Sequence, residues 1–266
     1  MLVFPQFIDG AACQFPARTQ LLFRTVTNEL ADGGTIKNED DLAIRTEWVL
    51  QYAGLTASEA SELEEFFTAV EGRLKTFVFL DPTSNLLASS EDPGSSYWSP
   101  DPNLVFTPLL PGPFENTTAT AIQNLGQAEG TLYQSLECPA WFTYCISVYL
   151  RASQATAAHL IAQDQAHQTK LELLVQPVWT RRHLRFNLGS GDLGIKVGLL
   201  VPPGAEVETY GFQLEPQRSP SPYKRTLGPG GVHAHARFAD DSIRLRAEGA
   251  DSYGCTVRVV ASTYLE

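Results

Sequence analysis

Two histidines near the end of the chain are spaced so that they could bind a metal ion. His233 and His235 are separated by one residue, and on a strand such positions face the same side. Asp240 or Asp241 would have to supply a third ligand. The alternative is that both histidines are solvated in a loop near a glycine-rich turn. We favour the loop, because no metal-ligand motif accompanies the pair.

Three groups of adjacent carboxylates could be imagined as acid and base catalysts: Glu39-Asp40-Asp41, Glu64-Glu65 and Asp240-Asp241. A glycosidase, for example a glycan depolymerase, needs two carboxyl groups at a fixed separation across a sugar cleft. Nothing in the sequence brings these groups together, so solvated faces are the better interpretation. Nucleophile-elbow, zinc-protease, dinucleotide and phosphate-loop motifs do not occur. The sequence therefore predicts that the protein is not an enzyme and has no cofactor and no metal.

Aromatic residues in the second part of the chain could bind sugars, because a flat ring can stack on the apolar C–H face of a pyranose. They are Tyr97, Trp98, Trp141, Phe142, Tyr144, Tyr149 and Trp179. The alternative is core packing. In the run 141–150, the even-numbered residues are the more apolar and are expected in the core. The candidate glycan contacts are therefore Trp98, Trp141 and Tyr149.

Composition restricts the class of protein. With 43% apolar residues, 17 prolines and 20 glycines among 266 residues, the chain can bury real cores connected by many turns. A net charge of −11 argues against binding to duplex nucleic acid or to an anionic bilayer. No apolar run approaches the ~20 residues of a membrane-spanning helix, and the N-terminus lacks the features of a signal peptide. The four scattered cysteines are expected to be small buried hydrophobes.

The first third of the chain is expected to be β-rich with one helix. Alternation over 42–52 predicts a half-buried strand with Leu42, Trp48 and Tyr52 on one face. The apolar-rich segment 21–28 is also expected to be a strand, and a turn at 31–34 follows it. Thr56 and Glu59 form a capping box that predicts a helix over 57–72. Its apolar stripe is Ala60, Leu63, Phe67, Val70 and Leu74. A short strand, 76–80, follows.

Beyond a stretch rich in Ser, Pro and Gly at 89–113, short and evenly spaced strands predict a β-sandwich, with jelly-roll topology. They are 117–123, 131–135, 141–151, 169–175, 184–187, 195–201 and 206–214. The segment 152–168 could be a short helix or a long loop. The expected domains are a β-sandwich with a helix (1–95), a jelly roll (96–225) and a closing hairpin (226–266). If that hairpin returns to the first domain, the jelly roll is an insertion.

Residues 45–82 resemble the N-terminal domain of phage distal-tail and tail-tip proteins, with relatives in gene transfer agents. The resemblance lies in the order of elements: an alternating strand, a GLT-x-x-E helix start, FF, then G-R and F-x-F-x-D. In that family the domain is a ring-building β-sandwich with a helix, located where the tail tube meets the tip. The resemblance implies a homo-oligomeric ring, usually a hexamer, with tail-tube and baseplate or tail-tip proteins as partners.

Residues 141–151, 178–182 and 210–226 resemble the carbohydrate-binding-module-like jelly rolls that phage tail and fibre proteins carry. Tyr210 stands where that family has tryptophan. The resemblance implies that the strand Gln213-Leu214-Glu215 and the exit at Tyr223 are structural.

Together these features predict a structural component of a phage or phage-like tail, a virion protein assembled in the bacterial host cytoplasm. Its jelly roll would be peripheral and could bind a host surface glycan. No nucleic acid and no membrane insertion are expected. The alternative is a stand-alone carbohydrate-binding module or adhesin, in which the first domain is only an anchor.

Overall fold

The computed structural model describes residues 1–7, 10, 13–40, 43–115, 117–189 and 191–262. It is mainly β, with one helix, and the chain divides into two compact units. Unit 1 comprises 1–8, 12–79 and 233–266, and unit 2 comprises 9–11 and 80–232. The mainly β fold class is as predicted. In the part of the chain that is described, no helix is both long and apolar enough to cross a bilayer.

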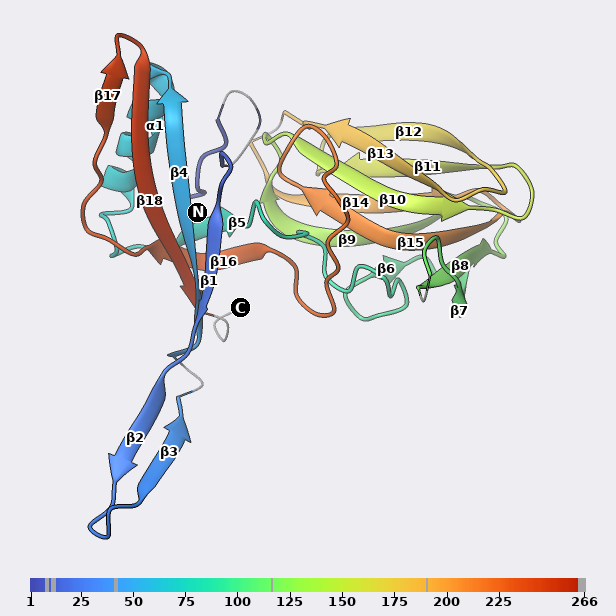
Figure 1. Ribbon diagram of the computed structural model, residues 1–266. Coiled ribbons are helices and arrows are strands. Elements are labelled where there is room, and N and C mark those ends of the chain that lie inside the picture. The colour runs from blue at the N-terminus through green and yellow to red at the C-terminus, as the bar shows by residue number, and fades with distance from the viewer. Residues whose placement is uncertain (8–9, 11–12, 41–42, 116, 190, 263–266) are drawn as a thin grey trace. The chain divides into compact units, whose positions relative to one another are not determined.

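Unit 1 is built on one six-stranded sheet (Figure 1). Its order is β1-β4-β18-β16-β5, and β17 pairs with β18. The strands are β1 (Arg18–Leu22), β4 (Arg45–Leu55), β5 (Phe77–Leu80), β16 (Val232–Phe238), β17 (Arg246–Gly249) and β18 (Ser252–Ser262). The C-terminal strand β18 runs antiparallel to β4, with Val259 opposite Trp48. The two ends of the chain therefore build one sheet, and unit 2 is inserted between them.

The core of unit 1 lies between this sheet and helix α1 (Ala57–Ala69). Trp48, Leu50 and Tyr52 of β4 are buried in it, as the alternation predicts. Leu42, expected on the same face, lies outside the described residues. His233 lies beside this core, with its ring 4.7 Å from that of Trp48.

The helix begins at the predicted capping box. The Glu59 amide donates to the Thr56 hydroxyl, and the Thr56 amide donates to the Glu59 carboxylate at 2.9 Å. The helix ends at Ala69 rather than at residue 72, because Glu71 and Gly72 both adopt positive φ. Leu74, predicted to continue the apolar stripe, is consequently exposed.

A two-stranded hairpin, which we call the arm, extends beyond the six-stranded sheet of unit 1 (Figure 1). Its strands are β2 (Thr25–Glu29) and β3 (Thr35–Glu39). Gly33, with φ 82°, makes the turn that the sequence predicts. The predicted single strand over 21–28 is in fact divided between β1 and β2.

Unit 2 is a sandwich of two five-stranded antiparallel sheets. The first, β13-β10-β15-β8-β7, contains β7 (Leu104–Pro111), β8 (Thr118–Asn124), β10 (Tyr144–Arg151), β13 (Thr180–Phe186) and β15 (Glu206–Glu215). The second, β12-β11-β14-β9-β6, contains β6 (Ser99–Pro100), β9 (Gly130–Pro139), β11 (Thr156–Gln163), β12 (Gln168–Val175) and β14 (Leu193–Val201).

Two expectations for unit 2 are wrong. The segment 152–168 is neither a helix nor a long loop, since it contains β11, whose Leu160, Ile161 and Ala162 are buried. Unit 2 also begins at residue 80 and ends at 232, not at 96 and 225. The reason is that Leu86 and Leu87 are buried and the Leu86 amide donates to the Leu214 carbonyl of β15. Composition did not reveal this, because the same stretch is rich in turn-forming residues.

Candidate functional site

The three candidate glycan contacts lie in very different surroundings. Trp98 is buried, and its indole N–H donates to the Ser89 carbonyl at 3.2 Å. Its ring packs 4.7 Å from Phe212. Trp98 is therefore a core residue of unit 2 and offers no face to a sugar, which corrects the expectation for that position.

Trp141, just before β10, is 41% exposed. The Asn187 side chain donates to its carbonyl oxygen at 2.7 Å and so holds the backbone at this position. Its ring meets Phe142 edge to face at 6.0 Å. Trp141 is therefore the most exposed of the three candidates, and its role as a glycan contact stays a prediction.

Tyr149 lies half-buried on β10, which is paired on both sides within the first sheet of the sandwich. Its neighbours Val148 and Leu150 face the core, so Tyr149 points to the outer face. Arg181 of β13 is opposite it on one side and Tyr210 of β15 on the other. Because paired residues of adjacent strands share a face, these three side chains lie together on the outside of the sandwich.

Around Tyr149 a band of aromatic and arginine side chains crosses the outer face; we call it the outer band. Its members are Phe114, Tyr149, Arg151, Trp179, Arg181 and Tyr210. The Phe114 ring is 52% exposed and lies 5.3 Å from Tyr149 and 6.0 Å from Tyr210. The Arg181 guanidinium lies 5.5 Å above the Tyr149 ring, and that of Arg151 lies 4.8 Å above the Trp179 ring.

Two N–H groups in the outer band are buried without a hydrogen-bond partner, the Trp179 Nε1 and the Arg181 Nε. The other nitrogens of Arg181 are occupied, since they donate to the Ser221 carbonyl at 2.5 Å and the Ser147 hydroxyl at 2.9 Å. A buried donor without an acceptor is costly. Because both atoms are buried, they lie out of reach of a ligand on this face.

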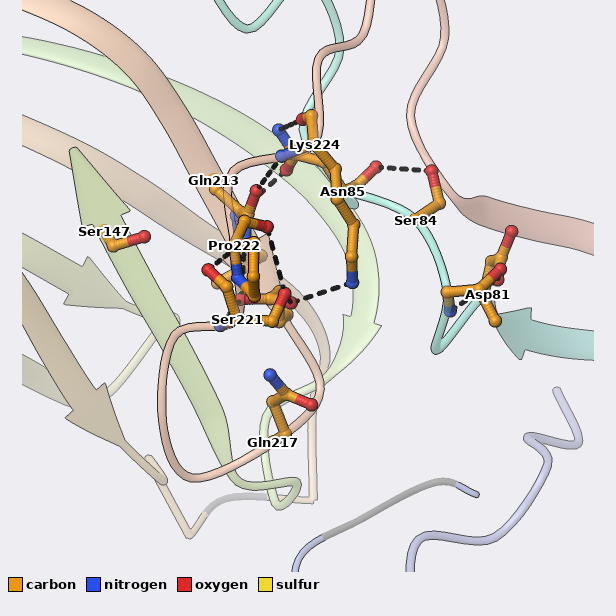
Figure 2. Close-up of polar contacts among 12 residues, drawn as sticks. Asp81, Ser84, Asn85, Ser147, Gln213, Gln217, Ser221, Pro222 and Lys224 are labelled. Carbon is orange, nitrogen blue, oxygen red and sulfur yellow. Dashed lines mark hydrogen bonds and ion pairs between the residues drawn. The ribbon is translucent and has the colours of Figure 1, made fainter. Parts of the chain in front are cut away.

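A buried polar network supports the other half of this outer face (Figure 2). Glu215 is buried and accepts hydrogen bonds from the Ser221 amide at 2.9 Å and the Gln213 side chain at 2.7 Å. The Lys224 ammonium lies 3.0 Å from it. Burial alone would raise the pKa of Glu215, but these hydrogen bonds and the nearby Lys224 lower it below its ordinary value.

Asn85 connects this network to the segment that precedes the sandwich strands (Figure 2). Its side-chain nitrogen donates to the Phe212 and Lys224 carbonyls at 2.8 and 3.2 Å. Its oxygen accepts from the Leu87 and Leu214 amides, both at 3.0 Å. Cys145 and Ser147, which alternation alone would leave on the open side of β10, are both buried, and they pair with Glu215 and Gln213 of this network.

The remaining candidate chemistry is not assembled into a site. All four cysteines are buried, as predicted. Burial raises the pKa of Cys145 to about 12 and that of Cys255 to about 11, so these thiols stay protonated at neutral pH. His235 is exposed on β16. Across the described ranges, no group of three or more His, Cys, Asp or Glu side chains could hold a metal ion.

Sequence reasoning had included Tyr149 and Trp179 among the aromatic residues but missed Phe114 and Arg181 as members of one site. One signal was available in the sequence. Trp179, Arg181 and Arg185 are separated by even numbers of residues, so on an extended chain they would lie on one face. Phe114 lies between β7 and β8 and is brought to Tyr149 only by strand pairing across the sheet.

Comparisons with known proteins give no family. No family model matches the chain, and no curated protein matches it. Among solved structures, the enzymatically active domain of bacteriophage CBA120 tailspike protein 4 is 12% identical, with a TM-score of 0.41. That likeness covers 52% of this chain and 22% of the tailspike chain, so the alignment spans under a quarter of that protein.

Two carbohydrate-binding modules are similar over about the same share of the chain. TmCBM61, solved in complex with β-1,4-galactotriose, is 15% identical with a TM-score of 0.39, over 51% of this chain and 99% of that one. The CBM22-1 xylan-binding domain of Paenibacillus barcinonensis Xyn10C is 11% identical with a TM-score of 0.38, over 53% and 95%. Both likenesses cover about half of this chain.

Proposed function

We propose that this protein is a non-catalytic structural component of a phage or phage-like tail, an adaptor of the distal-tail or tail-tip kind. It would assemble with copies of itself into a ring through unit 1, in the host cytoplasm, and contact tail-tube and baseplate proteins in the virion. The single observation that carries the proposal is the arm, a hairpin that has an uncovered apolar face.

The arm is amphipathic. The pairing of Val26 with Asn38 and of Asn28 with Ile36 puts Val26 and Ile36 on one face, together with the two asparagines. Leu30 follows Asn28 by two residues and continues this face. The opposite face carries Thr27 and Lys37, which pair with each other. Ile36 is 46% and Leu30 44% exposed.

An isolated two-stranded hairpin is marginally stable in water, because it has no core of its own. An arm of this kind gains stability when a second surface covers its apolar side. Further large apolar side chains are exposed at its base, at Leu21 and Phe23. Contacts in which the arm of one copy meets a different surface of the next are heterologous, and they close into a ring when the rotation allows.

The first prediction concerns assembly. The purified chain is expected to form a discrete multimer near six copies, seen as rings by negative-stain microscopy and measured by light scattering. Ile36→Asp should shift the mass to the monomer, because a charge would have to be buried in the contact. Thr27→Asp is the matched control: it adds the same charge on the polar face, opposite Lys37, and should assemble normally.

A strict monomer for the unmodified chain at high concentration would contradict the proposal. So would equal assembly of the Ile36→Asp and Thr27→Asp variants, since the contact would then not involve the apolar face of the arm.

A second candidate function is glycan binding by unit 2, alone or in addition to assembly. The observation that favours it is the outer band, where an exposed Phe114 ring lies beside Tyr149 and two guanidinium groups. Rings of this kind stack on sugars, and guanidinium groups donate hydrogen bonds to their oxygens.

The second prediction tests this function. On a broad glycan array the chain is expected to bind a limited set of glycans, and Phe114→Ala should weaken that binding about tenfold, or ~1.4 kcal/mol. Leu125→Ala is the control, because Leu125 is 61% exposed and follows the C-terminal end of β8, whereas Phe114 precedes its N-terminal end. If no glycan on the array binds, the proposal of glycan binding by unit 2 is wrong.

A further inference from the structure

We propose that the outer band and the adjoining face of β13 bind an acidic glycan, a chain of sugars that carry carboxylate groups. This inference rests on the second candidate function and narrows it to a class of ligand. It goes beyond aromatic stacking, because what distinguishes this face is its charge and its excess of hydrogen-bond donors.

The charge comes from β13, an edge strand of the first sheet. Arg181, His183 and Arg185 are paired with Tyr149, Ser147 and Cys145, so all three point to the outer face. The strand, TRRHLRF, contains no acidic residue, although the whole chain has a net charge of −11. Cations on an edge strand also discourage strand pairing between molecules, but that role alone does not require them to share one face.

Arg181 and Arg185 have no ion-pair partner among the residues that the structure describes. By contrast, Arg151 is neutralised by Glu208, and Arg225 by Glu91 at 3.0 Å. Two positive charges at the β13 edge of the face therefore have no ion-pair partner, and they can attract a negatively charged ligand.

The hydrogen-bonding capacity of this face is equally one-sided. The exposed donors of this face belong to Arg185, whose guanidinium has no hydrogen-bond or ion-pair partner among the residues that the structure describes. A neutral sugar presents hydroxyl groups that need acceptors as well as donors. A carboxylate is acceptor-only and matches the planar guanidinium in two-point geometry, so it fits this face better.

The basic face continues into a cavity of about 510 Å³. Arg185 lines it together with Thr143, Thr169 and Asn187, and none of its described lining residues is acidic. Asn187, which lines the cavity, also donates a hydrogen bond to the backbone carbonyl of Trp141. This bond places the exposed Trp141 close to the cavity. A ligand with charges at several positions along its length could contact both regions.

The experiment measures binding of the full chain to oligosaccharides of galacturonate, of mannuronate–guluronate and of hyaluronan. Each is paired with its carboxyl-reduced form, which keeps the sugar backbone and lacks the charge. At least one acidic oligosaccharide is expected to bind ten or more times more tightly than its reduced form. Because the attraction is between charges, raising NaCl from 50 to 500 mM should weaken binding at least fivefold.

Arg185→Gln should weaken binding of that oligosaccharide at least fivefold, and it should not affect folding because Arg185 is exposed. Lys170→Gln is the matched control, since it removes one exposed cation from β12 of the same unit and should leave the affinity unchanged.

The outcomes separate the class of ligand from the function. If neutral glycans bind as well as acidic ones, the inference is wrong but glycan binding stands. If no carbohydrate binds, both are wrong, whereas the assembly prediction is unaffected. Equal or tighter binding of oligothymidylate would also overturn the inference, because the face would then recognise polyanions in general.

Discussion

Gly198→Ala is expected to unfold the sandwich under conditions in which the unmodified protein is folded. Gly198 lies on β14, which is paired on both sides, with β9 and β11. A Cβ at this position would lie 1.9 Å from the Leu132 carbonyl oxygen and 2.8 Å from the Tyr133 Cα. Both are backbone atoms of β9, so relief requires two central strands to separate and not merely a change of rotamer.

We expect a loss of about 3 kcal/mol or more in the free energy of unfolding, and a fall of roughly 6–12 °C in the melting temperature of unit 2. Circular dichroism during heating measures the change, and limited proteolysis with mass analysis of the fragments locates it in unit 2. Gly228→Ala is the matched control, because a Cβ there would meet no atom within 4 Å. Equal melting of the two variants would show that β14 and β9 are farther apart than the structure has them.

Asn85→Ala is expected to have the next largest effect. The side chain is fully buried and makes four hydrogen bonds, two as donor and two as acceptor. Removing it leaves the Leu87 and Leu214 amides and two carbonyls without their partner in the interior. Each unsatisfied buried group costs about 1–3 kcal/mol, so the two amides alone predict a loss of about 2–6 kcal/mol.

Denaturant titration of the full chain measures this loss, with Gln217→Ala as control. The Gln217 side chain donates one exposed hydrogen bond, to the Ser219 carbonyl, and its removal should change stability by less than about 0.5 kcal/mol. A loss below 1 kcal/mol for Asn85→Ala would mean that water replaces the amide, and the segment 81–95 would then be less firmly part of unit 2.

Local patterns predicted the elements that depend on neighbouring residues. The capping box at Thr56 and Glu59 placed the start of α1 correctly, and Gly33 marked the turn of the arm. Alternation in β4 and β10 identified most of the residues that face the cores. These predictions succeed because a cap, a turn and the two-residue period of a strand are determined within a few residues of the chain.

Burial of individual polar and aromatic residues was not predictable in the same way. Trp98 was predicted as a possible glycan contact, yet it packs on Phe212, which is more than a hundred residues away. Ser147 was expected on the open side of β10 but is covered by the segment that contains Ser221. Such coverage depends on contacts between distant parts of the chain.

By itself the sequence determined the β-rich class, the single helix, the acidic surface and the aromatic residues from which a binding face could be made. Only the tertiary structure decided that β18 pairs with β4, that Phe114 and Arg181 meet at Tyr149, and that the arm has an uncovered apolar side. The physical reason is that strands far apart in the sequence can pair. Many alternative pairings of strands with similar apolar alternation would bury a similar apolar area, so the sequence pattern does not single out one of them.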